Sequence, residues 1–280
     1  MPSLYQSLRY ILYERKFNGL TSPFRVLPDF LVIGVGRGGT TSLYHYMSQH
    51  PCITKSAYDE IGFFDDNFHL GLNWYRSMFP TKFHKEKIIK KYGKFLTYDV
   101  TPSYIRHPWI IKRILENLPN PKIIIILRNP VDRTYSHYQM SKRNGNEKRT
   151  FEDVIESDKI NIQKNEHTPK NMNYFQTVVE NSYLARSFYE EQLQIWFKHF
   201  PKNKFLIIST EELAFSTDKS LEKIFTFLGV SNHKIFDLTK QNKADYPQMN
   251  SDTRKMLLDY FRPFNEKLYL LLGYRLDWDK

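Results

Sequence analysis

The chain has 280 residues, of which 41% are hydrophobic and 16% aromatic, so it can bury a sizeable core and is too apolar to be disordered. Lys and Arg total 41 against 30 Asp and Glu, a formal charge of +11, which favours an anionic ligand, an acidic substrate or a negative surface as partner. The single cysteine, Cys52, excludes an intramolecular disulfide and a cysteine-based zinc site, and fits a reducing compartment.

Residues 1–28 are interpreted as an N-terminal amphipathic and basic arm. Apolar residues recur there at helical spacing beside basic ones: Leu4, Leu8, Ile11 and Leu12 beside Arg9, Arg15 and Lys16. This pattern predicts a short helix that packs on the domain, with contact to a membrane surface as a second interpretation. We find no signal-peptide pattern and no apolar run long enough to span a bilayer, and therefore expect a soluble, cytoplasmic protein.

Residues 29–280 are predicted to form a single domain in which buried strands alternate with helices. The predicted strands are Phe30–Val35, Phe95–Asp99, Lys122–Leu127 and Lys204–Ser209. The predicted helices are Thr40–Gln49, Trp109–Asn117, Pro130–Arg143, Phe151–Ser157, Asn181–Phe200, Ser220–Leu228 and Asp252–Leu271. Short apolar strands separated by helical patterns predict an α/β fold with a central parallel sheet flanked by helices on both faces.

The most informative stretch is Asp29 to Ser42, DFLVIGVGRGGTTS. A buried strand runs into a glycine-rich turn and then into a helix, an arrangement whose backbone N–H groups and helix dipole hold phosphate. Gly34 and Gly39 fit the P-loop pattern of nucleoside triphosphate enzymes, but Thr40 stands in its lysine position. Because the cation is Arg37 instead, the turn predicts a phosphate cradle for a nucleotide that is not a triphosphate.

A second motif follows the strand Lys122–Leu127, in the segment LRNPVDRTYSHY. Asn129 is a plausible N-cap and Pro130 a plausible first helical residue. Arg128 lies at the carboxyl end of the strand, where open α/β sheets bind ligands, and Ser136 lies two helical turns beyond it. These two side chains are candidates to hold a second phosphate, and Arg133 either joins them or pairs with an acid.

Two segments are interpreted as loops or solvated faces at the rim of a site. Thr81 to Lys94 carries six lysines, and Asn144 to Asn173 is polar and lysine-rich apart from its short helix. Such segments often form lids or substrate rims in α/β enzymes.

A phosphate cradle and an Arg/Ser pair on neighbouring strands describe a nucleotide with phosphate at both ends of its ribose. In GVGRGGTTS and RNPVDRTYS the chain resembles sulfotransferases that use 3′-phosphoadenosine-5′-phosphosulfate (PAPS). The segments DEIGFFDDNFHLGLNWYRSMFP, from Asp59 to Pro80, and DVTPSY, from Asp99 to Tyr104, resemble the carbohydrate and bacterial branch of that family. The resemblance covers roughly residues 28–279, and the order and spacing of its motifs make it specific.

The resemblance implies a P-loop-like three-layer fold and transfer of the sulfuryl group from PAPS to a hydroxyl or amine, with adenosine 3′,5′-bisphosphate (PAP) released and no metal. It implies Glu60 as the base and Arg37 as the cation that stabilises the leaving group, with Asp65, Thr101 and Tyr104 as further substrate contacts. The residues implied to bind PAPS are Arg37, Gly38, Gly39, Thr40, Thr41, Ser42, Arg128 and Ser136. The acceptor it implies is a carbohydrate or glycolipid, not a nucleic acid.

Several alternatives stay open. His45, His69 and His137 are other candidates for the base. Gly62 and Val100 stand where some heparan-modifying members carry histidine and lysine, which weakens a heparan sulfate assignment. Two other functions are a non-catalytic α/β protein that binds nucleic acid or another polyanion, and a nucleotide kinase. The sequence does not predict the oligomeric state.

Overall fold

A computed structural model describes residues 17–165, 172–241 and 245–278, so the predicted helix within the first 16 residues lies outside the described residues. The described strands form one parallel sheet in the order β2-β3-β1-β4-β5. Their bounds are β1 Phe30–Gly34, β2 Ile53–Lys55, β3 Leu96–Val100, β4 Lys122–Leu127 and β5 Phe205–Ser209.

The α-helices are α2 Thr40–Met47, α3 Leu72–Ser77, α4 Lys82–Tyr92, α5 Ile110–Asn117, α6 Pro130–Arg143, α7 Phe151–Lys164, α8 Met172–Tyr174, α9 Tyr189–His199, α10 Thr210–Phe215, α11 Thr217–Leu228 and α12 Ser251–Leu272. Shorter 3-10 or π-helical turns are η2 Phe17–Phe24, η3 Phe68–Leu70, η4 Tyr104–Arg106, η5 Phe175–Val179, η6 Ala185–Ser187 and η7 Lys202–Lys204.

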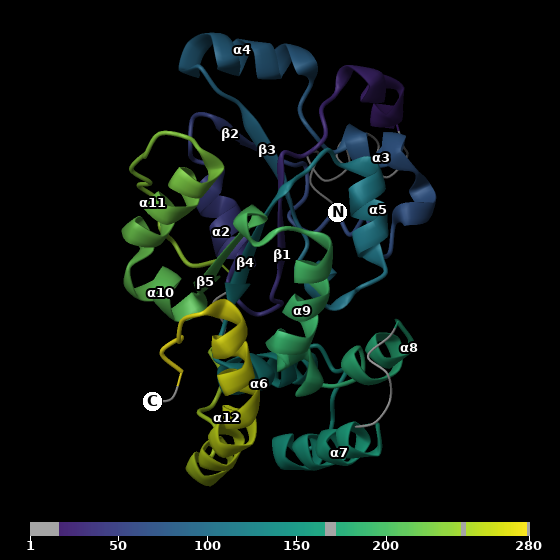
Figure 1. The fold of residues 1–280 in the computed structure, drawn as a ribbon, viewed down its shortest axis with the longest axis vertical. Coiled ribbons are helices and arrows are strands. Elements are labelled where there is room, and N and C mark those ends of the chain that lie inside the picture. Colours follow the sequence, from purple (N-terminus) through teal and green to yellow (C-terminus); the bar gives the residue numbers. More distant parts are fainter. Residues whose placement is uncertain (1–16, 166–171, 242–244, 279–280) are drawn as a thin grey trace.

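The sheet is buried between two helical layers, as Figure 1 shows. Successive side chains of β1 point to opposite faces, so Phe30 and Val32 pack with α2 and α11, whereas Leu31 and Ile33 pack with α3, α5 and α9. All five residues of β1 are buried, as is expected of a central strand covered on both faces. The predicted α/β three-layer fold with a central parallel sheet is therefore confirmed.

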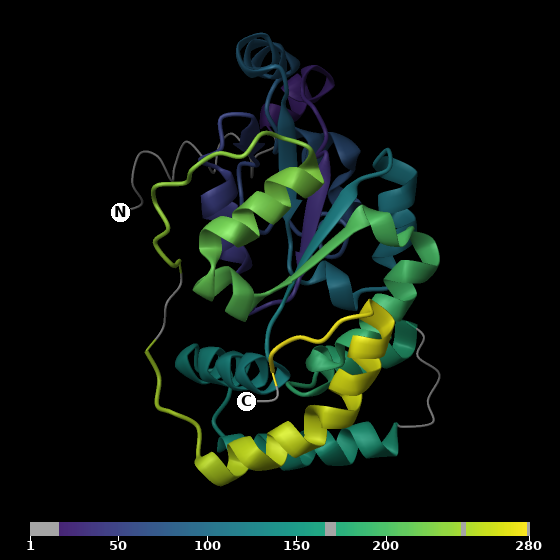
Figure 2. The ribbon, with the colours of Figure 1, turned by 60° about the vertical axis from the view of Figure 1, so that its left-hand side comes forward.

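A third apolar cluster lies beyond the carboxyl ends of the strands, where α6, α7 and α12 pack together (Figure 1). Figure 2 shows residues 229–241, after α11, passing along the outside of the molecule, and residues 245–250 leading into α12. Ser42 Oγ accepts a hydrogen bond of 3.0 Å from the backbone N–H of Gln241, so this connection contacts the helix that follows β1.

The structure corrects some predicted boundaries. The interpretation of Thr81–Lys94 as a loop is wrong, because Lys82–Tyr92 forms α4. Phe151–Ser157 extends to Lys164 as α7, so part of the second polar segment is helical, and Asn181–Phe200 is continuous helix only from Tyr189 to His199. The edge strand β2 was not predicted. Within the described ranges, no helix combines the length and the apolar character needed to cross a bilayer.

Candidate active site

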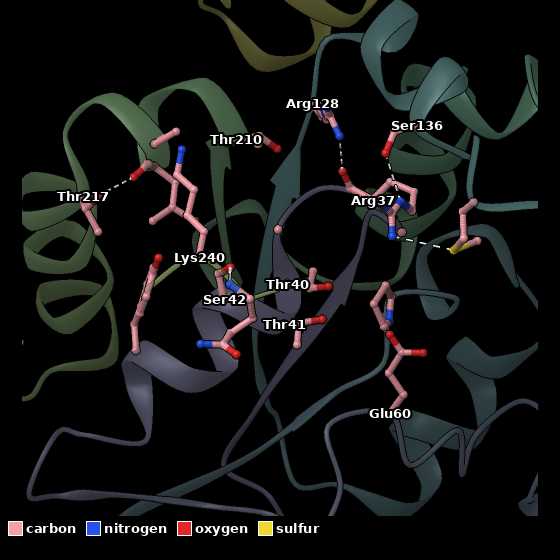
Figure 3. Close-up of a pocket in the computed structure, with 18 of the residues that line it drawn as sticks. Arg37, Thr40, Thr41, Ser42, Glu60, Arg128, Ser136, Thr210, Thr217 and Lys240 are labelled. Atoms are coloured by element: carbon pink, nitrogen blue, oxygen red, sulfur yellow. Dashed lines mark hydrogen bonds between the residues drawn. The ribbon is translucent and has the colours of Figure 1, made fainter. Parts of the chain in front are cut away.

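A cavity of about 570 Å³ lies at the carboxyl ends of β1 and β4, the edge at which open α/β sheets bind ligands. The turn between β1 and α2 lies at its centre, and Arg128 and the α6 side chain of Ser136 lie beside it (Figure 3). The rest of the lining comes from Glu60 and residues 102–106, from α10 and the start of α11, and from residues 238–241 and 246. Its polar lining includes Arg37, Thr40, Thr41, Ser42, Glu60, Ser103, Arg106, Arg128, Ser136, Thr210, Thr217, Lys240, Gln241 and Tyr246.

The turn after β1 is held by backbone contacts rather than by side-chain capping. Val35 N–H donates to the carbonyl of Ile126 at 2.8 Å, and Gly38 N–H donates to the carbonyl of Val35 at 2.9 Å. Gly39 has φ +93° and is the N-cap of α2, with no side chain capping the helix. The first N–H groups of α2 and its positive dipole end therefore face an anion-binding position.

Gly38 has no room for a side chain. A Cβ at this position would lie 2.7 Å from the carbonyl oxygen of Ile126 and 2.8 Å from that of Val35, and both are backbone atoms of the sheet or turn. We expect Gly38→Ala to lower the free energy of unfolding by about 1–3 kcal/mol, the usual cost of overpacking. Urea denaturation should measure this loss.

Gly36→Ala is the matched control for that substitution. A Cβ at Gly36 would meet no heavy atom within 4 Å, and its φ is not positive. Its free energy of unfolding should stay near that of the wild type. Equal stability of the two variants would contradict the close packing of Gly38.

Arg37, Ser136 and Arg128 converge on one side of the cavity (Figure 3). Arg37 Nε donates to Ser136 Oγ at 3.0 Å, and Arg128 Nη1 donates to the carbonyl of Arg37 at 3.0 Å. Burial and the neighbouring Arg128 lower the pKa of Arg37. The sequence assigned Arg37 and Ser136 to opposite ends of a nucleotide, whereas here they form one hydrogen-bonded pair.

Arg128 and Ser136 owe their positions to the local sequence after β4. Asn129 caps α6 by accepting a hydrogen bond from Val131 N–H, and Pro130 is the first helical residue. Tyr189 on α9 donates to the carbonyl of Arg128 at 2.8 Å, which fixes the end of the strand from the other side.

Glu60 also lines the cavity, below Arg37 in Figure 3, in the loop between β2 and η3, and it is exposed. Reduced hydration on the cavity wall, followed by the charge of Asp59, raises the pKa of Glu60 above its usual value of 4.5, although Arg106 and Arg37 lower it. A carboxylate with a raised pKa at the edge of a cavity suits a general base.

The Glu60 loop is held by a buried carboxylate at the end of β3. Asp99 accepts hydrogen bonds from the hydroxyl groups of Tyr75, Thr101 and Tyr104. Thr101 Oγ1 in turn accepts from Gly62 N–H at 3.2 Å, and Tyr104 Oη accepts from Phe64 N–H at 3.1 Å. This network fixes the backbone that carries Glu60.

The predicted substrate contacts of Asp65, Thr101 and Tyr104 are not found in the cavity lining. Thr101 and Tyr104 are buried behind the Glu60 loop, and their hydroxyl groups are used by Asp99 and by backbone N–H groups. Asp65 accepts from Ser103 and lies 3.3 Å from His107. These three side chains position the loop instead of facing the space where a substrate fits.

None of the three alternative histidines lines the large cavity. His45 pairs with Asp237 on the surface, and His69 is exposed in η3. His137 lies on a smaller neighbouring cavity. Arg133 is also outside the large cavity and, among the described residues, donates to neutral oxygens of Ser187, Thr134 and Tyr183 rather than to an acid.

Two lining cations were not predicted, Arg106 on η4 and Lys240 after α11. Arg106 stands two residues after the T-P-S-Y turn, and that spacing is the only signal that pointed to it. Lys240 is one of many surface lysines in the sequence and gave no signal. With Arg37 and Arg128 the lining carries four cationic side chains and one carboxylate, Glu60, so the cavity suits a multiply charged anion. No cluster of potential metal ligands occurs in the part of the chain that the structure describes.

The chain is similar to known proteins in both sequence and fold. Residues 27–261 match the family model described as the sulfotransferase domain. The structure is similar to the crystal structure of a sulfotransferase from Alicyclobacillus acidocaldarius, with a TM-score of 0.68 and 25% identity over 91% of this chain and 100% of that one.

Two relatives are similar over most of this chain. A membrane-associated sulfotransferase of Dictyostelium discoideum is 27% identical over 90% of this chain, and the human bifunctional heparan sulfate N-deacetylase/N-sulfotransferase 2 is 29% identical over 88%. The matches span 66% of the first relative and 30% of the second.

Proposed function

Because the chain belongs to the sulfotransferase family, we propose that it transfers the sulfuryl group of PAPS to a hydroxyl or amine group of a carbohydrate or glycolipid acceptor. The observation that carries this proposal is the meeting of an uncapped helix N-terminus, Arg37, Arg128 and Ser136 in one cavity. These are donors and cations for phosphate groups, on a cavity of the size that binds nucleotides.

The residues present fit a nucleotide with two phosphorylated positions. The backbone N–H groups of Gly39 to Ser42 and the Arg37 guanidinium would hold the 5′-phosphosulfate, and Arg128 with Ser136 would hold the 3′-phosphate. Gly38 was also predicted to bind PAPS, but its N–H donates to the carbonyl of Val35, so its role would be to shape the turn. PAPS would supply the activated sulfuryl group. The present hydrogen bond between Arg37 and Ser136 implies that nucleotide binding exchanges that contact for contacts to phosphate.

The roles of the side chains follow from where charge develops. Sulfuryl transfer leaves negative charge on the 5′-phosphate, and Arg37 with the N–H groups at the start of α2 would stabilise it. Glu60 would accept the proton of the acceptor hydroxyl or amine, because it is the one carboxylate among the lining residues and its pKa is raised. Thr101 and Tyr104 would act as positioning residues, because they hold the loop of Glu60.

A carbohydrate acceptor is supported by the relatives named for heparan sulfate. Gly62 and Val100 provide no polar side chain toward such a glycan. A transfer assay with labelled PAPS over glycans, glycolipids and small alcohols would identify the class of acceptor.

Binding of PAP in a magnesium-free buffer tests the nucleotide part of the proposal. At about 100 times its Kd, PAP should add about 2.7 kcal/mol to the free energy of unfolding, seen as a rise in Tm. ATP at the same concentration should raise Tm much less, because Thr40 stands where a triphosphate enzyme has its lysine. Equal shifts with both nucleotides would favour a kinase and contradict the proposal.

A further inference from the structure

A second, smaller cavity of about 80 Å³ adjoins the large one. Both are lined by Gly36, Arg37, Pro102, Arg106 and Met140. Arg37 donates from Nε to Ser136 Oγ at 3.0 Å and from Nη1 to the sulfur of Met140 at 3.6 Å, so its guanidinium is held where the linings of the two cavities overlap. Because a single water needs about 10–15 Å³, the smaller cavity has room for several waters or for one small oxyanion.

The lining of the small cavity is strongly cationic. Four arginines contribute to it, namely Arg37, Arg106, Arg133 and Arg186. Glu180 is the carboxylate that Arg106 and Arg186 share. No ion pair joins Arg37 or Arg133 to an acid of the described residues, and Arg133 is only 3% exposed. A buried guanidinium without a counter-charge is costly, so an anion that entered this space would be stabilised.

His137 lines the small cavity and contacts one of its arginines. Arg186 Nη1 lies 3.4 Å from His137 Nε2, which assigns Nε2 as the acceptor and leaves the proton on Nδ1. That Nδ1 is buried and has no partner among the described residues. Burial, together with Arg133 and Arg186, lowers the pKa of His137 to about 2, so the ring is a neutral donor at physiological pH.

Gln192 supports the arginines of the small cavity from behind. It lines the small cavity, and its buried side-chain oxygen also has no partner in the described structure. The Gln192 amide nitrogen donates to the carbonyls of Arg186 and Phe188, so this side chain holds the backbone beside Arg186, and the guanidinium groups are the donors that an anion in the cavity would meet.

We propose that the small cavity is an oxyanion subsite, which takes the sulfate or carboxylate group of an acidic acceptor. The inference rests on the proposed function, because it places this group next to the site of sulfuryl transfer. Arg106 links the two spaces: it lines both cavities and is one of the charges that act on Glu60. The enzyme would then prefer an acceptor that already carries negative charge near the reacting hydroxyl or amine.

Titration of the PAP complex with sodium sulfate tests the subsite apart from the nucleotide site. With PAP saturating, calorimetry at constant ionic strength should detect sulfate binding to the wild type, with chloride as the reference anion. Arg186→Gln, which is outside the large cavity, should weaken this binding by about tenfold and leave PAP affinity unchanged. Arg262→Gln removes one exposed guanidinium on α12 and should leave both affinities unchanged.

Two acceptors that differ by one carboxylate test whether the anion in the small cavity belongs to the acceptor or is a free ion. They are p-nitrophenyl glucuronide, which carries the carboxylate, and p-nitrophenyl glucoside, which does not. Arg186→Gln should raise KM for the glucuronide by about tenfold with little change for the glucoside. Equal KM changes for both would show that the cavity binds free inorganic anion only and would overturn the acceptor assignment. No sulfate binding to the PAP complex would overturn the subsite, whereas failure of PAP to bind would overturn the proposed function.

A crystal of the wild-type PAP complex soaked in selenate provides a readout that needs no variant. An anomalous peak beside Arg186 and His137 is expected. A selenate-soaked crystal without that peak would count against the subsite even if Arg186→Gln did not fold.

Discussion

Replacing Glu60 with glutamine should lower turnover by about 10²–10⁴-fold, the range associated with loss of a general base. The amide has the shape of the carboxylate but cannot accept the proton of the acceptor. PAP affinity should not fall, because a carboxylate accepts hydrogen bonds and supplies no donor to a phosphate group. Steady-state transfer from labelled PAPS and calorimetry with PAP measure the two quantities separately.

The pH profile of the wild type provides a second readout of the same role. Glu60 must be ionised to accept a proton, and its pKa is raised above 4.5. Activity should therefore fall on the acid side at a higher pH than an ordinary glutamate would give. Asp59→Asn is the matched control: it neutralises the adjacent carboxylate, which does not line the cavity, and should keep most of the activity. Wild-type turnover in Glu60→Gln would refute the assignment.

Arg128→Ala should weaken PAP binding by about 1.5–3 kcal/mol, the scale of a hydrogen bond to a charged group. Two effects contribute to this loss. The guanidinium lines the cavity, where we propose that it binds phosphate, and it also donates to the carbonyl of Arg37, so its removal should loosen the turn that carries the other cation. Calorimetric titration with PAP measures the change.

Arg143→Ala tests whether the effect of Arg128 on PAP binding comes from direct contact or from its charge alone. Arg143 is exposed at the end of α6 and is one of the charges that act on Arg37, but it does not line the cavity. Its loss should change PAP affinity by much less than the loss of Arg128. If Arg128→Ala bound PAP as tightly as the wild type, Arg128 would not belong to the nucleotide site.

The best-predicted elements are those whose signals are local. β4 and α6 have the predicted bounds, because an apolar run of branched residues forms a buried strand and Asn129-Pro130 starts the helix after it. α4 was missed because none of its residues is buried, so it shows no apolar periodicity. Thr81 caps its start and Gly93 ends it in the left-handed conformation, and both are weak signals in a lysine-rich segment.

For the site, the sequence by itself determined the glycine-rich turn after β1 and the Arg128/Ser136 motif, because each depends on residues close together in the chain, whereas their roles in phosphate binding stay predictions. Only the tertiary structure decided which side chains face the cavity. Thr101 and Tyr104 were assigned to substrate, but contacts with Asp99 and with the Glu60 loop turn their hydroxyl groups inward. Arg106, Lys240 and the arginines of the small cavity come from distant segments, and their neighbours are set by how the helical layers pack on the sheet.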